Sequence, residues 1–266
     1  MSRKVEKGKS ALLLEGDKDA RLYKKLSDPS RCRAFGAGNR HTAEKALHLL
    51  KNSNEPGVLA IVDADTDHIQ GKKSRHPDIL VTPTRDLECA LLQACLIGGL
   101  LVEFDLEPDC LGQCPEETVV QAVVPIAYLR YVAESKKWQV RMSDVDFNVF
   151  ISPKNLECDK DALCRHFAAL TLTAGVSDTD YRKELQILES VGHRPYQVAR
   201  GHDITAVLAW VIGIKRRKKK CGAKVTADLI ESYLRTAYSE AEFRKTGLFS
   251  KIAAWEKRNS PYKVLR

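Results

Sequence analysis

The sequence has no apolar run approaching the roughly 20 residues that a membrane-spanning helix needs. Its first ten residues are basic and lack the apolar core and small-residue cleavage site of a signal peptide. None of the eight cysteines belongs to a CxxC pair, so we expect a cytoplasmic protein with reduced thiols rather than a disulfide framework. A zinc set is conceivable, but its spacing fits no common zinc knuckle: Cys89, Cys95, Cys110 and Cys114.

The composition is that of an ordinary globular protein, and its charge is unevenly placed. Hydrophobic residues make up 44% and charged residues 29% of the 266 residues, which suits one large or two medium domains. Residues 1–110 carry as many basic as acidic side chains, so the whole net charge of +8 lies in residues 111–266. We therefore expect a neutral catalytic half joined to a half that meets a polyanion.

Short apolar runs alternate with helical patterns through the first hundred residues. Strands are predicted at 11–14, 31–35, 57–62 and 78–82, and helices at 17–26, 41–51 and 85–97. This order predicts an α/β domain over 1–110, with a mainly parallel sheet flanked by helices. The rest, 111–266, reads as a mostly helical, basic domain for substrate or partner binding, with helices at 118–136, 159–170, 180–190, 203–212, 227–238 and 240–257 and an isolated strand at 147–151.

The predicted strand at 57–62 ends in three acids at alternate positions, Asp63, Asp65 and Asp67. Open α/β sheets build their sites at the carboxyl ends of the strands. If the extended conformation continues, Asp63 and Asp65 point to the same side. Two carboxylates so close repel each other unless they are protonated or share a cation, and Mg²⁺ prefers oxygen ligands. The motif therefore predicts a site for a hard divalent cation.

Other acids occupy comparable places along the chain. Glu15 ends the first predicted strand, and Gly16 permits a tight turn and close approach to a ligand. Asp19 follows in the first turn of the next helix, so both carboxylates can face one crevice. Glu88 lies near the start of the predicted helix at 85–97.

In combination these segments resemble the TOPRIM fold, a Rossmann-like domain of topoisomerases, primases and OLD-type nucleases. The resemblance rests on Glu15-Gly16 with Asp17 and Asp19, on a Gly-Asn pair at 38–39, on the Asp63-Ala64-Asp65 motif, and on Asp86-Leu87-Glu88. It is strongest to the OLD-like TOPRIM family that includes the effector nucleases of PARIS anti-phage systems. Gly201-His202-Asp203 also resembles a C-terminal pattern of that family.

The resemblance implies a nuclease with one or two Mg²⁺ (or Mn²⁺) ions. Glu15 matches the TOPRIM glutamate that ligates metal or acts in acid/base catalysis, and Asp63 and Asp65 match its metal-binding pair. Asp19 matches an acid that helps to build a second metal position, while Asp67 or Glu88 completes the set. The implied reaction is phosphodiester hydrolysis.

The family further implies a toxic anti-phage effector that cleaves RNA, with tRNA favoured over duplex DNA. An ABC-type ATPase partner would restrain it, and the free form would be a homodimer. Two other functions stay open: a non-catalytic TOPRIM-like subunit that binds nucleic acid or scaffolds the ATPase, and a DNA nickase or nuclease. A primase-like transferase would need more nucleotide-handling sequence than is present.

Each acidic motif also has a structural interpretation. Glu15 and Asp19 could be solvated acids at a helix N-terminus, and the aspartates from 63 to 67 could form a turn. Asp86-Leu87-Glu88 could simply begin a helix. An EF-hand is excluded because His68 and Ser74 stand where the loop needs glycine and glutamate. A dehalogenase-type phosphatase would carry its DxD after the first strand.

Basic residues and one histidine are further candidates. His202 and Asp203 suit an acid/base or substrate-binding pair, or a structural histidine beside a helix-capping aspartate. The candidates for phosphate contact, which are equally typical of solvated loops, are Lys72, Lys73, Arg75, Lys215, Arg216, Arg217, Lys218, Lys219 and Lys220.

Overall fold

The computed structural model describes residues 8–72, 76–94, 96–107, 109–216 and 224–266. They form two compact units. The first comprises the described residues up to Asp67, Gly71–Leu87 and Arg235–Arg266, and the second comprises His68–Gln70 and the described part of Glu88–Leu234. This division differs from the expected boundary at 110, because the chain leaves the first unit earlier and returns to it for its last 32 residues.

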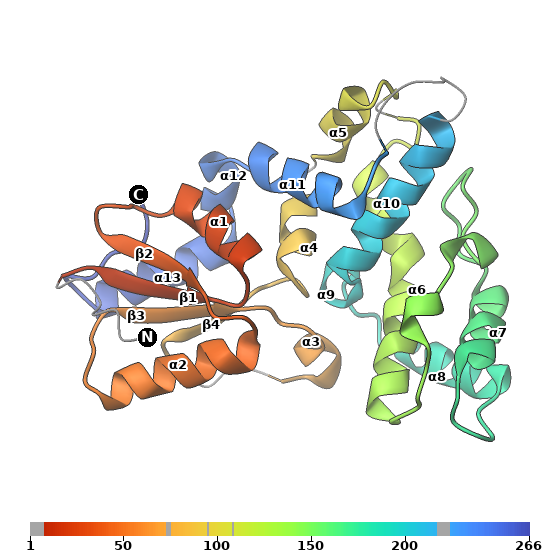
Figure 1. Cartoon of the computed structure of the whole chain (residues 1–266), viewed down its shortest axis with the longest axis horizontal. Helices are drawn as coiled ribbons and strands as arrows, with labels where there is room; N and C mark the ends of the chain where they lie inside the picture. The colour runs from red at the N-terminus through yellow and green to blue at the C-terminus, as the bar shows by residue number, and fades with distance from the viewer. Residues whose placement is uncertain (1–7, 73–75, 95, 108, 217–223) are drawn as a thin grey trace. The chain divides into compact units, whose positions relative to one another are not determined.

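A four-stranded parallel sheet forms the centre of the first unit (Figure 1). Its strands are β1 (Ser10–Leu14), β2 (Cys32–Gly36), β3 (Val58–Val62) and β4 (Ile79–Val81), in the order β2-β1-β3-β4. Every residue of β1 and β3 is buried, as expected for central strands covered on both faces. The predicted α/β class with a parallel sheet is confirmed.

Helices α1 (Asp17–Leu26) and α2 (Arg40–Asn52) cover opposite faces of this sheet (Figure 1). On the α2 side, Ala43 and Leu47 are fully buried against alternate residues of β1 and β3. The intervening residues of these strands, such as Leu12 and Leu14, face the other side and are also buried. Both faces of β1 and β3 are therefore covered by a helix.

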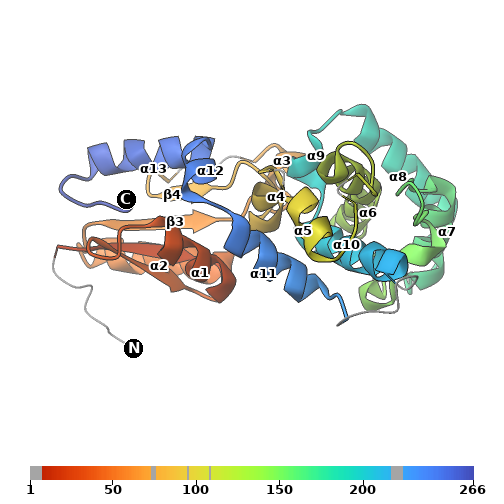
Figure 2. The same ribbon diagram turned by 90° about the horizontal axis from the view of Figure 1, so that it is seen from above.

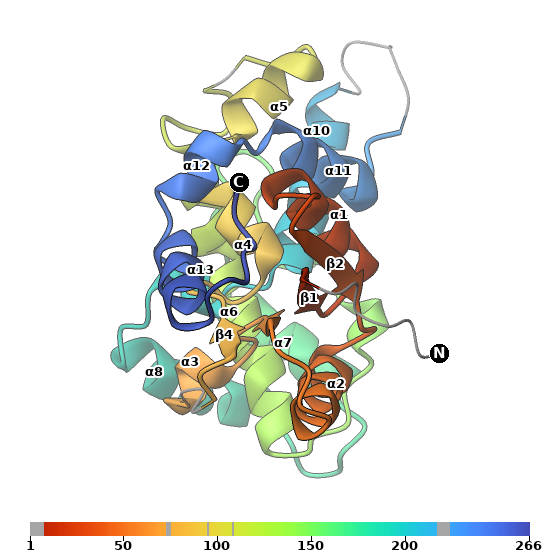
Figure 3. The ribbon, with the colours of Figure 1, turned by 90° about the vertical axis from the view of Figure 1, so that its left-hand side faces the viewer.

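The C-terminal segment belongs to the first unit because polar contacts fasten it to the strands and to α1. It contains α12 (Glu240–Arg244) and α13 (Gly247–Arg258), and α13 lies beside β4 (Figure 3). The indole Nε1 of Trp255 donates a 2.7 Å hydrogen bond to Asp78, just before β4. Lys25 at the end of α1 donates to the carbonyls of Thr236 and Tyr238, each at 2.6 Å.

Close packing at Gly57 adds to this attachment. Gly57 precedes β3 with a left-handed φ of 69°, and a Cβ there would collide with the ring of Tyr262. Glycine is therefore favoured at this position for two reasons: the left-handed backbone conformation and the close approach of the C-terminal segment.

The second unit is helical, as predicted for most of residues 111–266. It contains α5 (Ile97–Glu103), α6 (Pro115–Ser135), α7 (Lys160–Leu170), α8 (Asp178–Ser190), α9 (Pro195–Val198) and α10 (Gly201–Arg216), while α4 (Leu87–Leu92) and α11 (Ala227–Ala237) run across its boundaries. The long helix α6 is buried on most sides and packs against α7, α8, α9 and α10 (Figure 2). Among the residues that the structure describes, no helix is long and apolar enough to cross a membrane.

Three predicted elements are wrong. The isolated strand at 147–151 is a 3₁₀ turn (Phe147–Val149), and Ile151 forms only a single bridge to Cys158. The helix at 85–97 is shorter, because α4 spans only Leu87–Leu92 and α5 begins at Ile97. The helix at 240–257 is two helices, since the Thr246 side chain accepts from the Phe249 amide and starts α13 anew.

Candidate functional site

The acidic residues that follow β1 and β3 meet at one edge of the sheet. β1 and β3 are parallel neighbours, with Leu14 opposite Ile61, so both chains leave the sheet at the same edge. There the Glu15 carboxylate accepts a 2.8 Å hydrogen bond from the backbone amide of Asp63. Two segments 48 residues apart in sequence are thereby joined at the position that the sequence predicted.

Glu15 has an unusual electrostatic environment. Its pKa is raised from 4.5 to about 7, chiefly by partial burial and with contributions from the nearby charges of Asp65 and Asp19. The hydrogen bond from the Asp63 amide and the charge of Arg40 oppose the rise. A carboxyl group that titrates near neutral pH can take up or release a proton under physiological conditions.

This shift predicts that stability depends on pH in a definite direction. Between pH 4.5 and about 7 the folded chain holds a proton on Glu15 that the unfolded chain has lost, so the free energy of unfolding falls as pH rises through that window. We expect the urea midpoint, measured in EDTA, to fall less from pH 5 to pH 8 in Glu15→Gln than in the wild type. Glu55→Gln, which removes an exposed acid, is the control and should match the wild type. Parallel curves for all three proteins would contradict the assignment.

Asp65 does not continue the strand. β3 ends at Val62, and Asp65 has a left-handed φ of 48°, so the expected strand alternation of Asp63 and Asp65 is not maintained. The amide of Asp65 instead donates to the carbonyl of Arg85 at 2.8 Å. Desolvation raises the pKa of Asp65, while the charges of Arg85 and Arg40 oppose that rise.

The loop after β4 supports this turn through hydroxyl groups. The hydroxyl of Thr82 accepts from the amide of Ala64 at 3.0 Å and donates to the carbonyl of Thr84 at 2.8 Å. The hydroxyl of Thr84 in turn donates to the carbonyl of Asp86 at 2.9 Å. Both threonines are buried, so the loop that carries Arg85 and Asp86 is fixed beside the turn at 63–67.

Asp19 faces the start of its own helix. Its carboxylate accepts a 2.8 Å hydrogen bond from the amide of Gly16, in the turn that follows Glu15. A Cβ at Gly36, the last residue of β2, would lie only 2.6 Å from the Asp17 carboxylate, so β2 approaches this turn closely. Asp19 thus serves the helix start, and its charge also acts on Glu15.

Arg40 is a functional candidate that the sequence analysis missed. It is the first residue of α2, and its guanidinium pairs with Asp67 at 2.7 Å and with Glu44 at 3.0 Å. The same group donates to the carbonyl of Asp63 at 3.1 Å. The sequence did contain a signal for this residue. Arg40 directly follows the Gly38-Asn39 loop, which comes just after the end of β2 at the edge of the sheet. The carboxylate of Asp67 is therefore held in an ion pair.

The acidic side chains at this edge are chemically suited to bind Mg²⁺, but they are not preorganised around an ion site. Carboxylate oxygens of Glu15, Asp63 and Asp65 are the hard ligands that this ion prefers. Within the described ranges, however, no group of three or more His, Cys, Asp or Glu side chains is placed to hold a metal ion. Side-chain movement at this edge would have to accompany metal binding.

Glu88 belongs to the second unit, where it is buried at the start of α4. Its charge acts there on His202, whose Nδ1 lies 2.9 Å from the carboxylate of Glu231. The hydrogen bond with Glu231 raises the pKa of His202, burial opposes the rise, and Glu88 adds to it. The histidine is half-exposed and Glu231 is buried. The pair therefore consists of a partly exposed imidazole that is hydrogen-bonded to a buried carboxylate.

Asp203 does not share the environment of His202. It forms a two-pronged ion pair with Arg130 of α6, with nitrogen–oxygen distances of 2.8 and 3.0 Å. Both side chains are largely buried. His202 and Asp203 therefore do not form a single acid/base pair in the structure, because each residue has its own partner.

No protein-family model matches this chain, and no curated protein matches it. A functional assignment must therefore rest on the residues at the edge of the sheet and on the motifs that they form.

The basic candidates are only partly described. Lys72 is exposed after α3 (Asp67–Gln70), and Lys215 and Arg216 end α10, where the guanidinium of Arg216 lies over the ring of Phe104. The other proposed phosphate contacts lie outside the described residues: Lys73, Arg75, Arg217, Lys218, Lys219 and Lys220. Their role stays a prediction.

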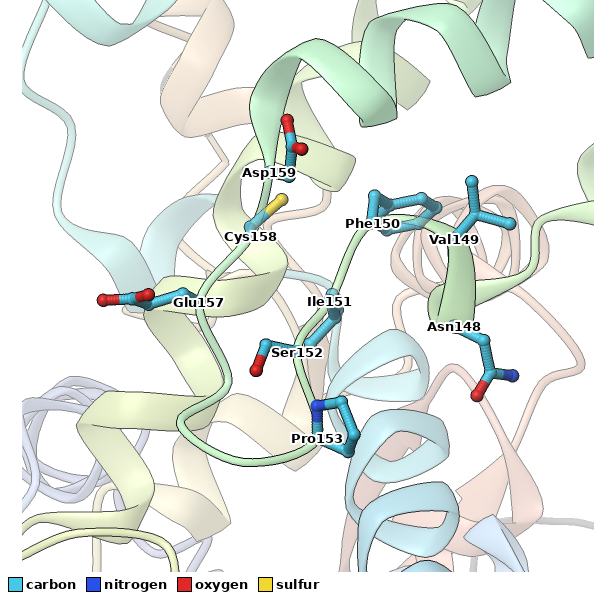
Figure 4. A pocket seen from close by; sticks show the side chains of 9 residues that line it. All are labelled: Asn148, Val149, Phe150, Ile151, Ser152, Pro153, Glu157, Cys158 and Asp159. Carbon is cyan, nitrogen blue, oxygen red and sulfur yellow. The ribbon is translucent and has the colours of Figure 1, made fainter.

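A surface pocket of about 630 Å³ lies in the second unit (Figure 4). Its walls are the chain from Asn148 to Pro153 and that from Glu157 to Asp159, without a basic side chain. Burial raises the pKa of the Cys158 thiol to about 12, so it is a poor nucleophile, and Asp159 caps α7. The pocket therefore offers a phosphodiester no positively charged side chain and no reactive thiol.

Proposed function

We propose that the protein is a Mg²⁺-dependent endonuclease with a TOPRIM-type catalytic unit that hydrolyses nucleic-acid phosphodiesters. The contact between Glu15 and the amide of Asp63 carries this proposal. It unites two of the four motifs of the family resemblance at the carboxyl edge of a parallel sheet, where α/β proteins build their sites.

Glu15, Asp63 and Asp65 would hold the cation, with Asp19 near enough to influence a second one. A bound Mg²⁺ or Mn²⁺ ion lowers the pKa of water and neutralises charge on a phosphate. Glu15 has two alternative roles in this proposal, as a ligand of the ion or as the acid/base group. In the second role, its pKa of about 7 in the metal-free chain would suit it to accept a proton from the attacking water. Arg40 and Arg85 supply positive charge beside the acids, which favours the approach of a polyanion.

The family resemblance supports RNA, with tRNA favoured, as the substrate, and a toxic role in anti-phage defence. On this proposal an ABC-type ATPase restrains the nuclease, and the free protein is a homodimer. The basic excess after residue 110 supports contact with a phosphate backbone.

Two observations favour a second function. The ion pair of Arg40 with Asp67, together with the lack of a prearranged cluster of three ligands among the described residues, suits a non-catalytic module that binds nucleic acid or its ATPase. Such a module would use the same unit without metal chemistry.

A cleavage assay separates these functions. Purified protein is incubated with labelled tRNA, single-stranded RNA and supercoiled plasmid, in Mg²⁺ or in EDTA, beside Asp63→Asn and the control Asp78→Asn, whose carboxylate pairs with Lys51 and Trp255. We expect RNA cleavage that requires Mg²⁺ and falls at least about a hundredfold only in Asp63→Asn. Binding of RNA without cleavage would favour the non-catalytic module, and nicking of plasmid alone would favour a DNA nuclease.

A further inference from the structure

Arg40 is placed where a cation would otherwise neutralise the acids. It begins α2 at the carboxyl edge of the sheet, and its three nitrogens contact Glu44, Asp67 and the carbonyl of Asp63. The side chains of Arg40 and Asp67 are only 26% and 13% exposed, so their attraction is less screened than that of a surface pair.

The same guanidinium influences the carboxylates proposed as metal ligands. The positive charge of Arg40 acts on both Glu15 and Asp65. Arg40 therefore offsets part of the repulsion among these acids.

We propose that Arg40 is a resident counter-ion of the acidic edge, and that it competes with the divalent cation for the carboxylate of Asp67. This inference rests on the cation site of the proposed function. An ion that gained Asp67 as a ligand would bring two positive charges close to the guanidinium, and the repulsion between the two cations would weaken the ion pair. Arg40 holds the turn at 63–67 in place until the metal arrives.

The helix α2 offers a closely matched control. Near its other end, Lys51 pairs with Asp78 at 2.8 Å, and these side chains are 27% and 13% exposed, almost the same as in the Arg40–Asp67 pair. Lys51→Gln and Arg40→Gln each remove one positive charge from the same helix. Lys51→Gln breaks the ion pair with Asp78, and Arg40→Gln breaks those with Asp67 and Glu44. Only Arg40→Gln frees a carboxylate at the acidic edge.

The test is the binding of Mn²⁺ to the full chain, measured by isothermal titration calorimetry. We expect Arg40→Gln to bind Mn²⁺ about tenfold more tightly than the wild type, because it releases an anionic ligand and removes a competing charge. Lys51→Gln should bind as the wild type does. In the Arg40→Gln background, Asp67→Asn should cancel most of the gain.

The outcomes distinguish this inference from the proposed function. Mn²⁺ binding that is unchanged or weaker in Arg40→Gln, with the far-UV circular dichroism of the wild type, would overturn the counter-ion role and leave the nuclease proposal intact. Absence of Mn²⁺ binding in every variant would overturn both. Tighter binding in Arg40→Gln without RNA cleavage would support the counter-ion role and count against the nuclease.

Discussion

Glu15→Gln should reduce Mg²⁺-dependent RNA cleavage by about 10²- to 10⁴-fold, the usual range for loss of an acid/base group. Glutamine keeps an oxygen that can accept the 2.8 Å hydrogen bond from the Asp63 amide, so the junction of the two segments is preserved. It removes the charge and the proton that titrates near pH 7. The measurement is the initial rate of cleavage at saturating Mg²⁺, with circular dichroism to verify the fold.

Asp17→Asn is the matched control for this experiment. Asp17 lies in the same turn between β1 and α1, but its side chain is exposed and belongs to no part of the proposed metal set. We expect its cleavage rate to stay within about twofold of the wild type, since an exposed charge at a helix start has only a small effect. Equal losses in both variants would show that the turn matters rather than the carboxylate of Glu15.

Asp203→Ala should lower the free energy of unfolding by about 3–5 kcal/mol, because it leaves the guanidinium of Arg130 buried without its counter-charge. The two side chains are only 7% and 14% exposed and share two hydrogen bonds. The change should appear in urea denaturation followed by circular dichroism, and as a lower melting temperature in calorimetry.

A surface ion pair in the same unit provides the comparison. Asp161 pairs with Arg182 at 2.9 Å, but these side chains are 64% and 40% exposed. Asp161→Ala should therefore cost less than about 1 kcal/mol. If Asp203→Ala were as harmless as Asp161→Ala and instead impaired RNA binding, Asp203 would be a substrate-binding residue, as the sequence first allowed.

The fold of the first unit was predictable because its signals are local. Five apolar residues in β3, bounded by Gly57 and Asp63, can hardly be anything but a buried strand, and the helix predicted at 17–26 is observed with the same bounds. Residues 240–257 were misread as one helix because their apolar spacing continues across the junction. The side chain of Thr246, which restarts the helix, gives no periodic signal.

Which segments of the chain make up the first unit was not predictable in the same way. The return of residues 235–266 depends on contacts between distant positions, such as Trp255 with Asp78 and Lys25 with Tyr238. Nothing near these residues in sequence specifies such partners. The sequence also favoured a division where its net charge changes, at 110, and charge is a property of the surface rather than of the core.

At the edge of the sheet, the sequence indicated which carboxylates lie together. It did not indicate the backbone turn and the arginine beside them. Glu15 and Asp63 follow apolar strands, so their meeting followed from strand order. The left-handed turn at Asp65 is a feature of backbone geometry. The ion pair of Asp67 involves Arg40, a residue outside any acidic motif. The metal, the substrate and the ATPase partner remain predictions.

The return of the C-terminal segment to the sheet has a consequence for synthesis on the ribosome. β1 to β4 emerge early, but the helix that lies beside β4 and the chain that packs on Gly57 are translated last, after the whole helical unit. Nascent chains stopped before residue 235 would lack the carbonyl groups to which Lys25 donates and the indole that donates to Asp78. The contacts at the amino ends of β3 and β4 can therefore form only after the helical unit has been translated.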